Sequence, residues 1–169
     1  MHIRSEDAGD APAIHNVNQQ AFGRVAEADL VDLLRAHGRC TLSLVTEEAD
    51  QVVGHALFTP VRIETPDGPL TAQGLGPLAV LPGWQRKGIG SALVRAGLEQ
   101  LRAAGHRLVV VEGSPRYYPR FGFQDATPLG ISCQFTPPPG CFMIQELVPG
   151  ALAGVSGTVY YADEFLAVG

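Results

Sequence analysis

The sequence has few basic residues, and this shortage excludes two classes of protein. Lysine and arginine total 12, against 17 aspartates and glutamates, so the formal net charge is −5. A general nucleic-acid or membrane-surface binder needs an excess of positive charge, so we expect no nucleic acid and no membrane as partner. Any positively charged patch on this protein must be local.

The sequence also lacks the patterns of a disulfide framework, a metal site or a targeting segment. Its three cysteines, Cys40, Cys133 and Cys141, are odd in number and show no Cys-x-x-Cys spacing, which is typical of reduced thiols. The five histidines form no metal-ligand spacing with them, so we expect no metal. The first residues are acidic where a signal peptide would be apolar, and no apolar run is long enough to span a bilayer. The sequence therefore predicts a cytoplasmic protein.

Length and hydrophobic content indicate a single domain. A chain of 169 residues with 46% hydrophobic residues can bury one sizeable core but is short for two. We expect one domain over residues 1–169, in which residues 148–169 form a packed C-terminal extension. The hydrophobic pattern predicts helices over residues 10–21, 26–37 and 88–104, strands over 3–4, 41–46, 51–62, 74–82, 107–112 and 141–147, and a short helical turn over 114–120.

The stretch around Gly88 has the order strand, glycine loop, helix. A helix start leaves backbone N–H groups without partners and carries the positive end of the helix dipole, so it can bind a phosphate or pyrophosphate. Gly88 and Gly90 have no side chains that would hold an anion away from the backbone, and Arg86 and Lys87 add positive charge. The stretch therefore predicts an anion cradle.

Two common nucleotide motifs fail at specific positions of this loop. A dinucleotide fingerprint needs a third glycine where Leu93 stands, and no clear acidic ribose partner follows on a second strand. A P-loop needs Lys and Ser or Thr after its last glycine, but Gly88 is followed by Ile89 and Gly90. Neither nucleotide reading fits.

The remaining pattern resembles the acyl-CoA loop of the GNAT superfamily of N-acetyltransferases. That pattern is Gln/Arg-x-x-Gly-x-Gly/Ala after a strand ending in Val-x-Pro, and the chain has Gln85-Arg86-Lys87-Gly88-Ile89-Gly90 after Val80-Leu81-Pro82. The superfamily often adds Tyr-x-x-x-Gly-Phe after its next strand, matched by Tyr118-Pro119-Arg120-Phe121-Gly122-Phe123. The preceding Tyr117 makes the run similar to that of a bacterial subgroup of predicted acetyltransferases. The resemblance covers roughly residues 51–123.

The resemblance implies a fold and a cofactor site. It implies an α/β protein with a mixed, mostly antiparallel sheet that splays between its central strands, and helices on both faces. The co-substrate would be acetyl-CoA, held along the organising strand and in the loop that follows it. The implied cofactor-binding residues are Leu78, Ala79, Val80, Gln85, Arg86, Lys87, Gly88, Ile89, Gly90 and Ser91.

The resemblance also implies a general acid. Tyr118 matches the superfamily tyrosine that points toward the CoA sulfur, and an aromatic packing residue is the alternative for it. Tyr117 would line the acceptor pocket or the core. A backbone N–H near Leu78 would stabilise the oxyanion.

The general base is harder to assign. Some superfamily members carry a glutamate on the organising strand, but residues 73–76 provide no carboxylate. Glu112, at the end of the neighbouring strand where a splayed site should open, is our candidate, and a solvated strand end is the alternative. The other candidates, acting through ordered water, are Glu47, Glu48, Glu64 and His55.

The sequence thus predicts an N-acetyltransferase that transfers the acetyl group of acetyl-CoA to a primary amine by direct attack in a ternary complex. We expect a small-molecule acceptor, and a protein N-terminus or lysine is an alternative. Two readings without catalysis also stay open: an acyl-CoA sensor that regulates a partner, and a scaffold that kept only the fold. Homodimerisation through the C-terminal strands is plausible by resemblance alone.

Overall fold

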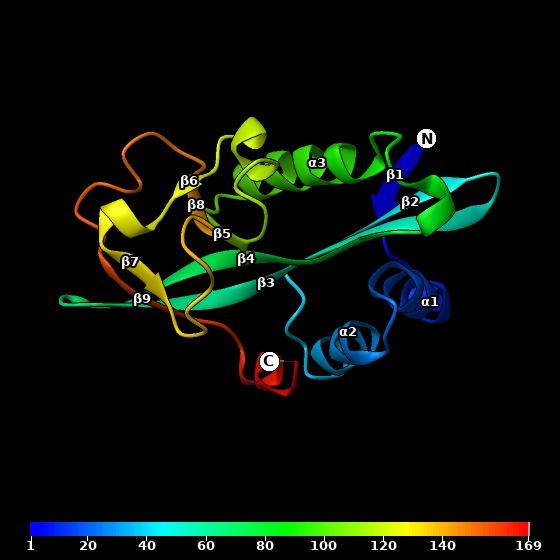
Figure 1. Ribbon diagram of the computed structural model, residues 1–169, viewed down its shortest axis with the longest axis horizontal. Helices are drawn as coiled ribbons and strands as arrows, with labels where there is room; N and C mark the ends of the chain where they lie inside the picture. Colours follow the sequence, from blue (N-terminus) through cyan, green and yellow to red (C-terminus); the bar gives the residue numbers. More distant parts are fainter. Residues whose placement is uncertain (169) are drawn as a thin grey trace.

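A computed structural model of the chain describes residues 1–168 and shows one mixed β-sheet flanked by helices (Figure 1). The main path through the sheet has the order β1-β2-β3-β4-β5-β8-β6, and β9 pairs with both β3 and β7. Among the strand pairs formed by residues 1–168, only β4–β5 and β7–β9 are parallel. The strands are β1 (His2–Ser5), β2 (Leu42–Glu48), β3 (Gln51–Thr65), β4 (Gly68–Val80), β5 (Leu108–Glu112), β6 (Gln124–Asp125), β7 (Ile131–Cys133), β8 (Phe142–Glu146) and β9 (Gly157–Tyr160).

The helices cover both faces of the sheet. Helices α1 (Ala11–Phe22) and α2 (Ala26–Ala36) lie on one face, and α3 (Ile89–Ala103) lies on the other (Figure 1). The order β4, α3, β5 forms a βαβ unit, as the continuous apolar run before Glu112 predicts. The predicted α/β class, a mixed and mostly antiparallel sheet with helices on both faces, is therefore confirmed. Short 3-10 helices are η1 (Ala8–Asp10), η2 (Pro82–Trp84), η3 (Tyr118–Phe121), η4 (Thr127–Leu129) and η5 (Asp163–Ala167).

The alternating side chains of the central strands explain why both faces are covered. Val45 and Leu57 pack into the cluster under α1 and α2, whereas Leu44 and Phe58 pack into the cluster under α3. Gly97 lets α3 approach closely, because a Cβ at this position would lie 2.3 Å from the ring of Phe58. The sheet is thus buried on both sides along β2 and β3.

Two local predictions need correction. The polar segment at residues 47–50 was expected to connect two strands, but β2 runs on through Glu48 and the turn is only Ala49-Asp50. Both turn residues have positive φ, 49° and 62°, as a two-residue hairpin of this twist requires. The predicted helical turn over residues 114–120 is also displaced, because the observed turn is η3.

Strand β4 contains the irregularity that opens the sheet. Its pairing with β3 shifts register at Gly76-Pro77, so Leu75 lies opposite Phe58 and Leu78 opposite Ala56. Its parallel pairing with β5 covers only Gln73, Gly74 and Leu75. Beyond Leu75 the strands separate, which leaves the β5-facing edge of the last residues of β4 without a strand partner. The splay is the one that the family resemblance implies.

The C-terminal segment packs against the body of the protein. Strand β9 pairs with the end of β3, where Arg62, Ile63 and Glu64 lie opposite Tyr160, Val159 and Thr158. Helix η5 then lies beside α2 (Figure 1), and Glu164 binds the side chains of His37 and Arg39 at 3.0 Å. Within residues 1–168, no helix is long and apolar enough to cross a membrane.

Candidate active site

The loop after β4 is tied to the strand and opens into the start of α3. Gln85 Nε2 donates a hydrogen bond of 3.0 Å to the carbonyl oxygen of Val80. Gly88 caps the helix with φ 84°, a left-handed conformation that a glycine adopts without strain. The first helical bond of α3 runs from Ala92 N–H to Gly88 O, so the N–H groups of Ile89, Gly90 and Ser91 precede it, as at any helix start. The geometry is that of an anion cradle.

Positive charge stands at the same place, and it is exposed. Arg86 has φ 63° within the turn, and Lys87 places its Nζ 5.5 Å from the ring centroid of Trp84, a cation–π contact. Both side chains are solvent-exposed and bind no carboxylate in the described part of the chain. Their charge is therefore free for an anionic ligand.

Tyr117 connects this cradle to the aromatic turn η3. Its hydroxyl lies 3.0 Å from Ser91 Oγ on the first turn of α3, and a Cβ at Gly90 would lie 3.3 Å from the same hydroxyl. Tyr117 packs against the core under α3, and the core is one of the two places where we expect this side chain. The other placement, in the wall of the acceptor pocket, is wrong, because the side chain is directed at α3 instead.

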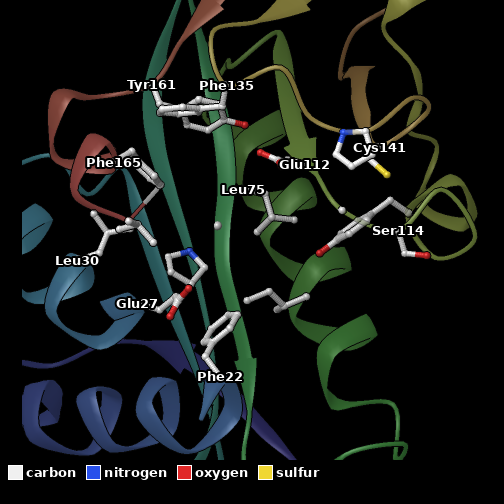
Figure 2. A pocket seen from close by; sticks show the side chains of 17 residues that line it. Phe22, Glu27, Leu30, Leu75, Glu112, Ser114, Phe135, Cys141, Tyr161 and Phe165 are labelled. Carbon is white, nitrogen blue, oxygen red and sulfur yellow. The ribbon is translucent and has the colours of Figure 1, made fainter. Parts of the chain in front are cut away.

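A pocket of about 740 Å³ opens where β4 and β5 separate (Figure 2). Its walls come from the end of α1, the start of α2, the bulge of β4, the end of β5 with the segment that follows it, the loop between β7 and β8, and the C-terminal segment. The lining residues are Phe22, Glu27, Leu30, Leu75, Gly76, Pro77, Leu78, Glu112, Gly113, Ser114, Tyr118, Phe135, Pro138, Cys141, Tyr161, Phe165 and Val168.

Tyr118 reaches this pocket from η3. Its ring lies edge-on to Tyr117 and Phe123, and Gly113 leaves it room, because a Cβ there would lie 2.3 Å from the ring. Burial, with a smaller contribution from Tyr117, raises the pKa of Tyr118 to about 12. The phenol therefore keeps its proton at neutral pH and can donate a hydrogen bond into the pocket.

Glu112 reaches the same pocket from the end of β5. Figure 2 shows its carboxylate and the hydroxyl of Tyr161 directed at the same end of the pocket. Partial burial raises the pKa of Glu112 above 4.5, and burial raises the pKa of Tyr161 well above its usual value. The structure therefore brings the two predicted catalytic residues, Tyr118 and Glu112, into one cavity.

The other candidate bases lie outside the lining of this pocket. Glu47 is bound to Arg4, Glu48 to the amino terminus and Glu64 to Arg62. His55 is fully buried between Asn18 and Ser43, and burial lowers its pKa to about 4. A core histidine without contact to the pocket is positioned for packing.

Several lining residues are not signalled by the motifs. Glu27 is the clearest, since it stands three, four and seven residues before Leu30, Val31 and Leu34, so a carboxylate lies on the buried face of α2. That spacing could have identified it. Phe135, Tyr161 and Phe165 carry no comparable signal, because long-range packing alone brings them to the pocket.

Among residues 1–168, one group of side chains has ligand atoms close enough to hold a metal ion: His15, Asp29 and Asp32. His15 Nδ1 lies 2.8 Å from Asp32 Oδ2, so a hydrogen bond accounts for the proximity of these two side chains. None of the three lines the pocket. The pocket itself presents carboxylates, hydroxyls and one thiol.

Comparison with known proteins supports the same assignment. Residues 2–126 match the family described as acetyltransferase (GNAT) domain. The chain belongs to the GNAT acetyltransferase family. As a GNAT protein it is 38% identical over 166 residues to the uncharacterized N-acetyltransferase YhbS of Escherichia coli K12, covering 98% of each chain. It is 40% identical over 164 residues to YjhQ of the same strain, covering 93% of this chain and 90% of YjhQ.

Two solved GNAT structures resemble this one over nearly the whole chain. The crystal structure of E. coli YhbS in complex with CoA has a TM-score of 0.92 at 37% identity, with 99% of this chain and 93% of that chain covered. The structure of a GNAT family acetyltransferase from Brucella melitensis in complex with acetyl-CoA has a TM-score of 0.81 at 39% identity, with 97% of each chain covered. This GNAT chain is therefore an acyltransferase by family, and its C-terminal segment lies within the matched length.

Proposed function

We propose that this protein is an N-acetyltransferase that transfers the acetyl group of acetyl-CoA to a primary amine by direct attack in a ternary complex. The observation that carries the proposal is the separation of β4 from β5 beyond Leu75. This gap lies between the anion cradle at the start of α3 and the pocket that contains Tyr118 and Glu112. A molecule with a pyrophosphate at one end and a thioester at the other fits both places at once.

Acetyl-CoA would lie along the open edge of β4. The pantetheine arm would pair with the backbone of Leu78, Ala79 and Val80 as an additional strand. The pyrophosphate would take the N–H groups of the loop from Gln85 to Ser91, with Arg86 and Lys87 nearby. The two relatives whose structures are complexes with CoA and acetyl-CoA support acetyl-CoA as the ligand.

The reaction needs a free amine, a stabilised oxyanion and a departing thiol. The amine nitrogen attacks the thioester carbon, and the negative charge that forms on oxygen is met by the backbone N–H near Leu78. The C–S bond then breaks as the amide forms, and the second proton that the attacking nitrogen must lose passes through solvent to the departing thiolate, which leaves as the thiol. Tyr118, with a pKa of about 12, holds its proton too strongly to give it up before the transition state, so it stabilises the leaving sulfur by donating a hydrogen bond.

Glu112 would accept the proton that the ammonium group must lose before attack. Burial raises its pKa toward that of a useful base, and it lies at the end of β5 where the strands separate. A carboxylate there also attracts the cationic form of the acceptor. Glu112 thus acts before the amine attacks, and Tyr118 acts when the sulfur leaves.

The pocket favours a small acceptor. A cavity of about 740 Å³ lies within the range of sites for small ligands. Its walls are mostly apolar, and the C-terminal segment forms one of them, so a protein acceptor would reach the interior with a projecting chain end. We therefore propose a small-molecule amine ahead of a protein N-terminus or lysine.

The test is a binding titration that separates the cradle from the pocket. Thermal unfolding is followed with CoA, acetyl-CoA, pantetheine and NAD, and a ligand at about a hundred times its Kd stabilises by roughly 2.7 kcal/mol. CoA and acetyl-CoA should raise Tm, whereas pantetheine, which lacks the pyrophosphate, and NAD should not. Gly90→Asp should abolish the CoA shift by placing a negative charge in the cradle. Gly9→Asp, at an exposed glycine of η1 with open space around it and no left-handed φ, should keep the shift. Absence of any CoA shift would sink the proposal.

A further inference from the structure

The charge of the pocket is one-sided. Glu27 and Glu112 are the charged residues of its described lining, and no lysine, arginine or histidine is among them. Aromatic rings form much of the remaining wall, and their faces attract cations as carboxylates do. These rings belong to Phe22, Tyr118, Phe135, Tyr161 and Phe165. The pocket therefore suits a positively charged ligand with an apolar framework.

Glu27 is placed to bind a cation without taking part in the transfer. It lies in the first turn of α2, its side chain is 11% exposed, and it lines the pocket beside Phe22 (Figure 2). Its partner is Arg24, which is 56% exposed and lies outside the pocket lining. Arg24 donates hydrogen bonds of 2.5–3.2 Å to both oxygens of the Glu27 carboxylate. An ion pair with so exposed a partner contributes little stability, so a cation in the pocket can share or replace it.

The two carboxylates mark two ends of the pocket. In Figure 2, Glu27 comes from α2 on one side of β4, and Glu112 comes from β5 on the other side. Leu75 lies between them in this view, and the labelled aromatic rings, those of Phe22, Phe135, Tyr161 and Phe165, lie around the pocket. A ligand that satisfies both ends has two positive groups separated by an apolar spacer.

We propose that the acceptor is such a diamine: one amino group reacts beside Tyr118 and Glu112, and Glu27 binds the second cation. This inference rests on the proposed function, because it concerns the acceptor of that transfer. In this proposal Glu27 determines specificity: it lowers KM for an acceptor that carries a second positive group. An acceptor with a carboxylate in place of the second amine would meet Glu27 as a like charge, which costs binding.

The experiment uses three acceptors that share one reacting group. These are 4-(aminomethyl)benzylamine, benzylamine and 4-(aminomethyl)benzoic acid, whose second substituents are positive, absent and negative. Binding to the CoA-loaded protein is measured by calorimetry, and acetylation is measured by thiol release. We expect kcat/KM to fall in that order, with at least about tenfold between the first and the last. Glu27→Gln should remove most of this difference by raising KM for the diamine at nearly constant kcat.

Two variants separate cation binding from a structural role. Arg24→Gln breaks the same ion pair but leaves the Glu27 carboxylate free, so it should bind the diamine as well as the parent protein does, or more tightly. Glu99→Gln removes another i,i+3 pair with an arginine, Arg102, on α3 away from the pocket, and should change nothing. Equal losses in Arg24→Gln and Glu27→Gln, or equal binding of all three acceptors, overturn the proposal.

Failure of this inference is distinguishable from failure of the proposed function. Acetyl-CoA binding is measured on the same samples, and Glu27→Gln should leave its Kd unchanged. Loss of acetyl-CoA binding by the parent protein overturns the acetyltransferase proposal and this one with it. Normal acetyl-CoA binding together with no preference for the diamine, or with no binding of any of the three acceptors, overturns this inference alone.

Discussion

His55 lies fully buried in β3, and its hydrogen-bond partners suit the neutral imidazole, which carries one ring proton. Asn18 Nδ2 donates to Ile14 O at 3.0 Å and lies 3.2 Å from His55 Nδ1, so Nδ1 is the acceptor. His55 Nε2 therefore carries the proton and donates to Ser43 Oγ at 2.9 Å. Protonation would place an N–H on Nδ1, where it would face the N–H donor of the Asn18 side chain.

Burial lowers the pKa of His55 from 6.5 to about 4, and the charges of Glu6 and Arg35 act in opposite directions on it. In the unfolded chain the imidazole binds its proton near pH 6.5, so acid favours the unfolded state between the two pKa values. The stability is complete above pH 6.5 and is lost as the pH falls toward 4. Between about pH 7.5 and pH 5 the free energy of unfolding should decrease by about 2 kcal/mol, which lowers Tm by about 4–8 °C in a chain of this size.

Denaturant unfolding at a series of pH values measures this loss. His55→Gln should remove most of the decrease between pH 7.5 and pH 5, because glutamine does not titrate. His15→Gln, at a half-exposed histidine of α1, should retain it. NMR titration of the His55 ring in the folded protein gives the pKa directly, whatever the stability of the variants. A folded-state pKa near 6.5, or the same loss of stability in His55→Gln, would refute the reasoning.

Three further predictions concern the site and the core. Tyr118→Phe should lower kcat at least about tenfold while acetyl-CoA affinity is unchanged, because only the hydrogen bond to the leaving sulfur is lost; equal kcat in a thiol-release assay excludes the role. In the parent enzyme kcat/KM should fall as the pH drops through the raised pKa of Glu112, since a protonated carboxyl accepts no proton, and Glu112→Gln should abolish that acidic limb in pH–rate profiles. Gly97→Ala should lower the free energy of unfolding by about 1–3 kcal/mol in denaturant unfolding, because the added Cβ meets Phe58 and this outweighs the better helix propensity of alanine. Adding Phe58→Leu to this variant should restore part of the loss.

Local signals in the sequence were sufficient for the cradle. The order of strand, glycine loop and helix depends on residues close together in the chain, so Gln85 to Gly90 could be placed before any packing was known. The same holds for α1, which begins after Asp10 and has Pro12 in its first turn, as helix-start preferences predict. The continuous apolar run of β5 likewise indicated a strand buried on both faces.

Register within the sheet was less visible from the sequence. The hairpin between β2 and β3 was predicted too wide, because acidic residues such as Glu47 and Glu48 suggest a loop. Pairing with β1 and β3 keeps them in the strand, and Glu47 is satisfied by Arg4. Strand-end residues are decided by such cross-strand partners, which lie far away in the sequence.

The sequence by itself indicated the family, the strand, loop and helix in which we propose the cradle, and two residues that line the pocket, Tyr118 and Glu112. Only the tertiary structure decided what else surrounds that pocket. Glu27 faces it because α2 packs on the sheet with this side chain turned inward, and Phe165 reaches it because β9 pairs with β3 and carries the C-terminal segment to α2. The same packing removed His55 from the candidate bases by burying it. Burial, charge environment and proximity depend on contacts between distant segments, and no local pattern encodes them.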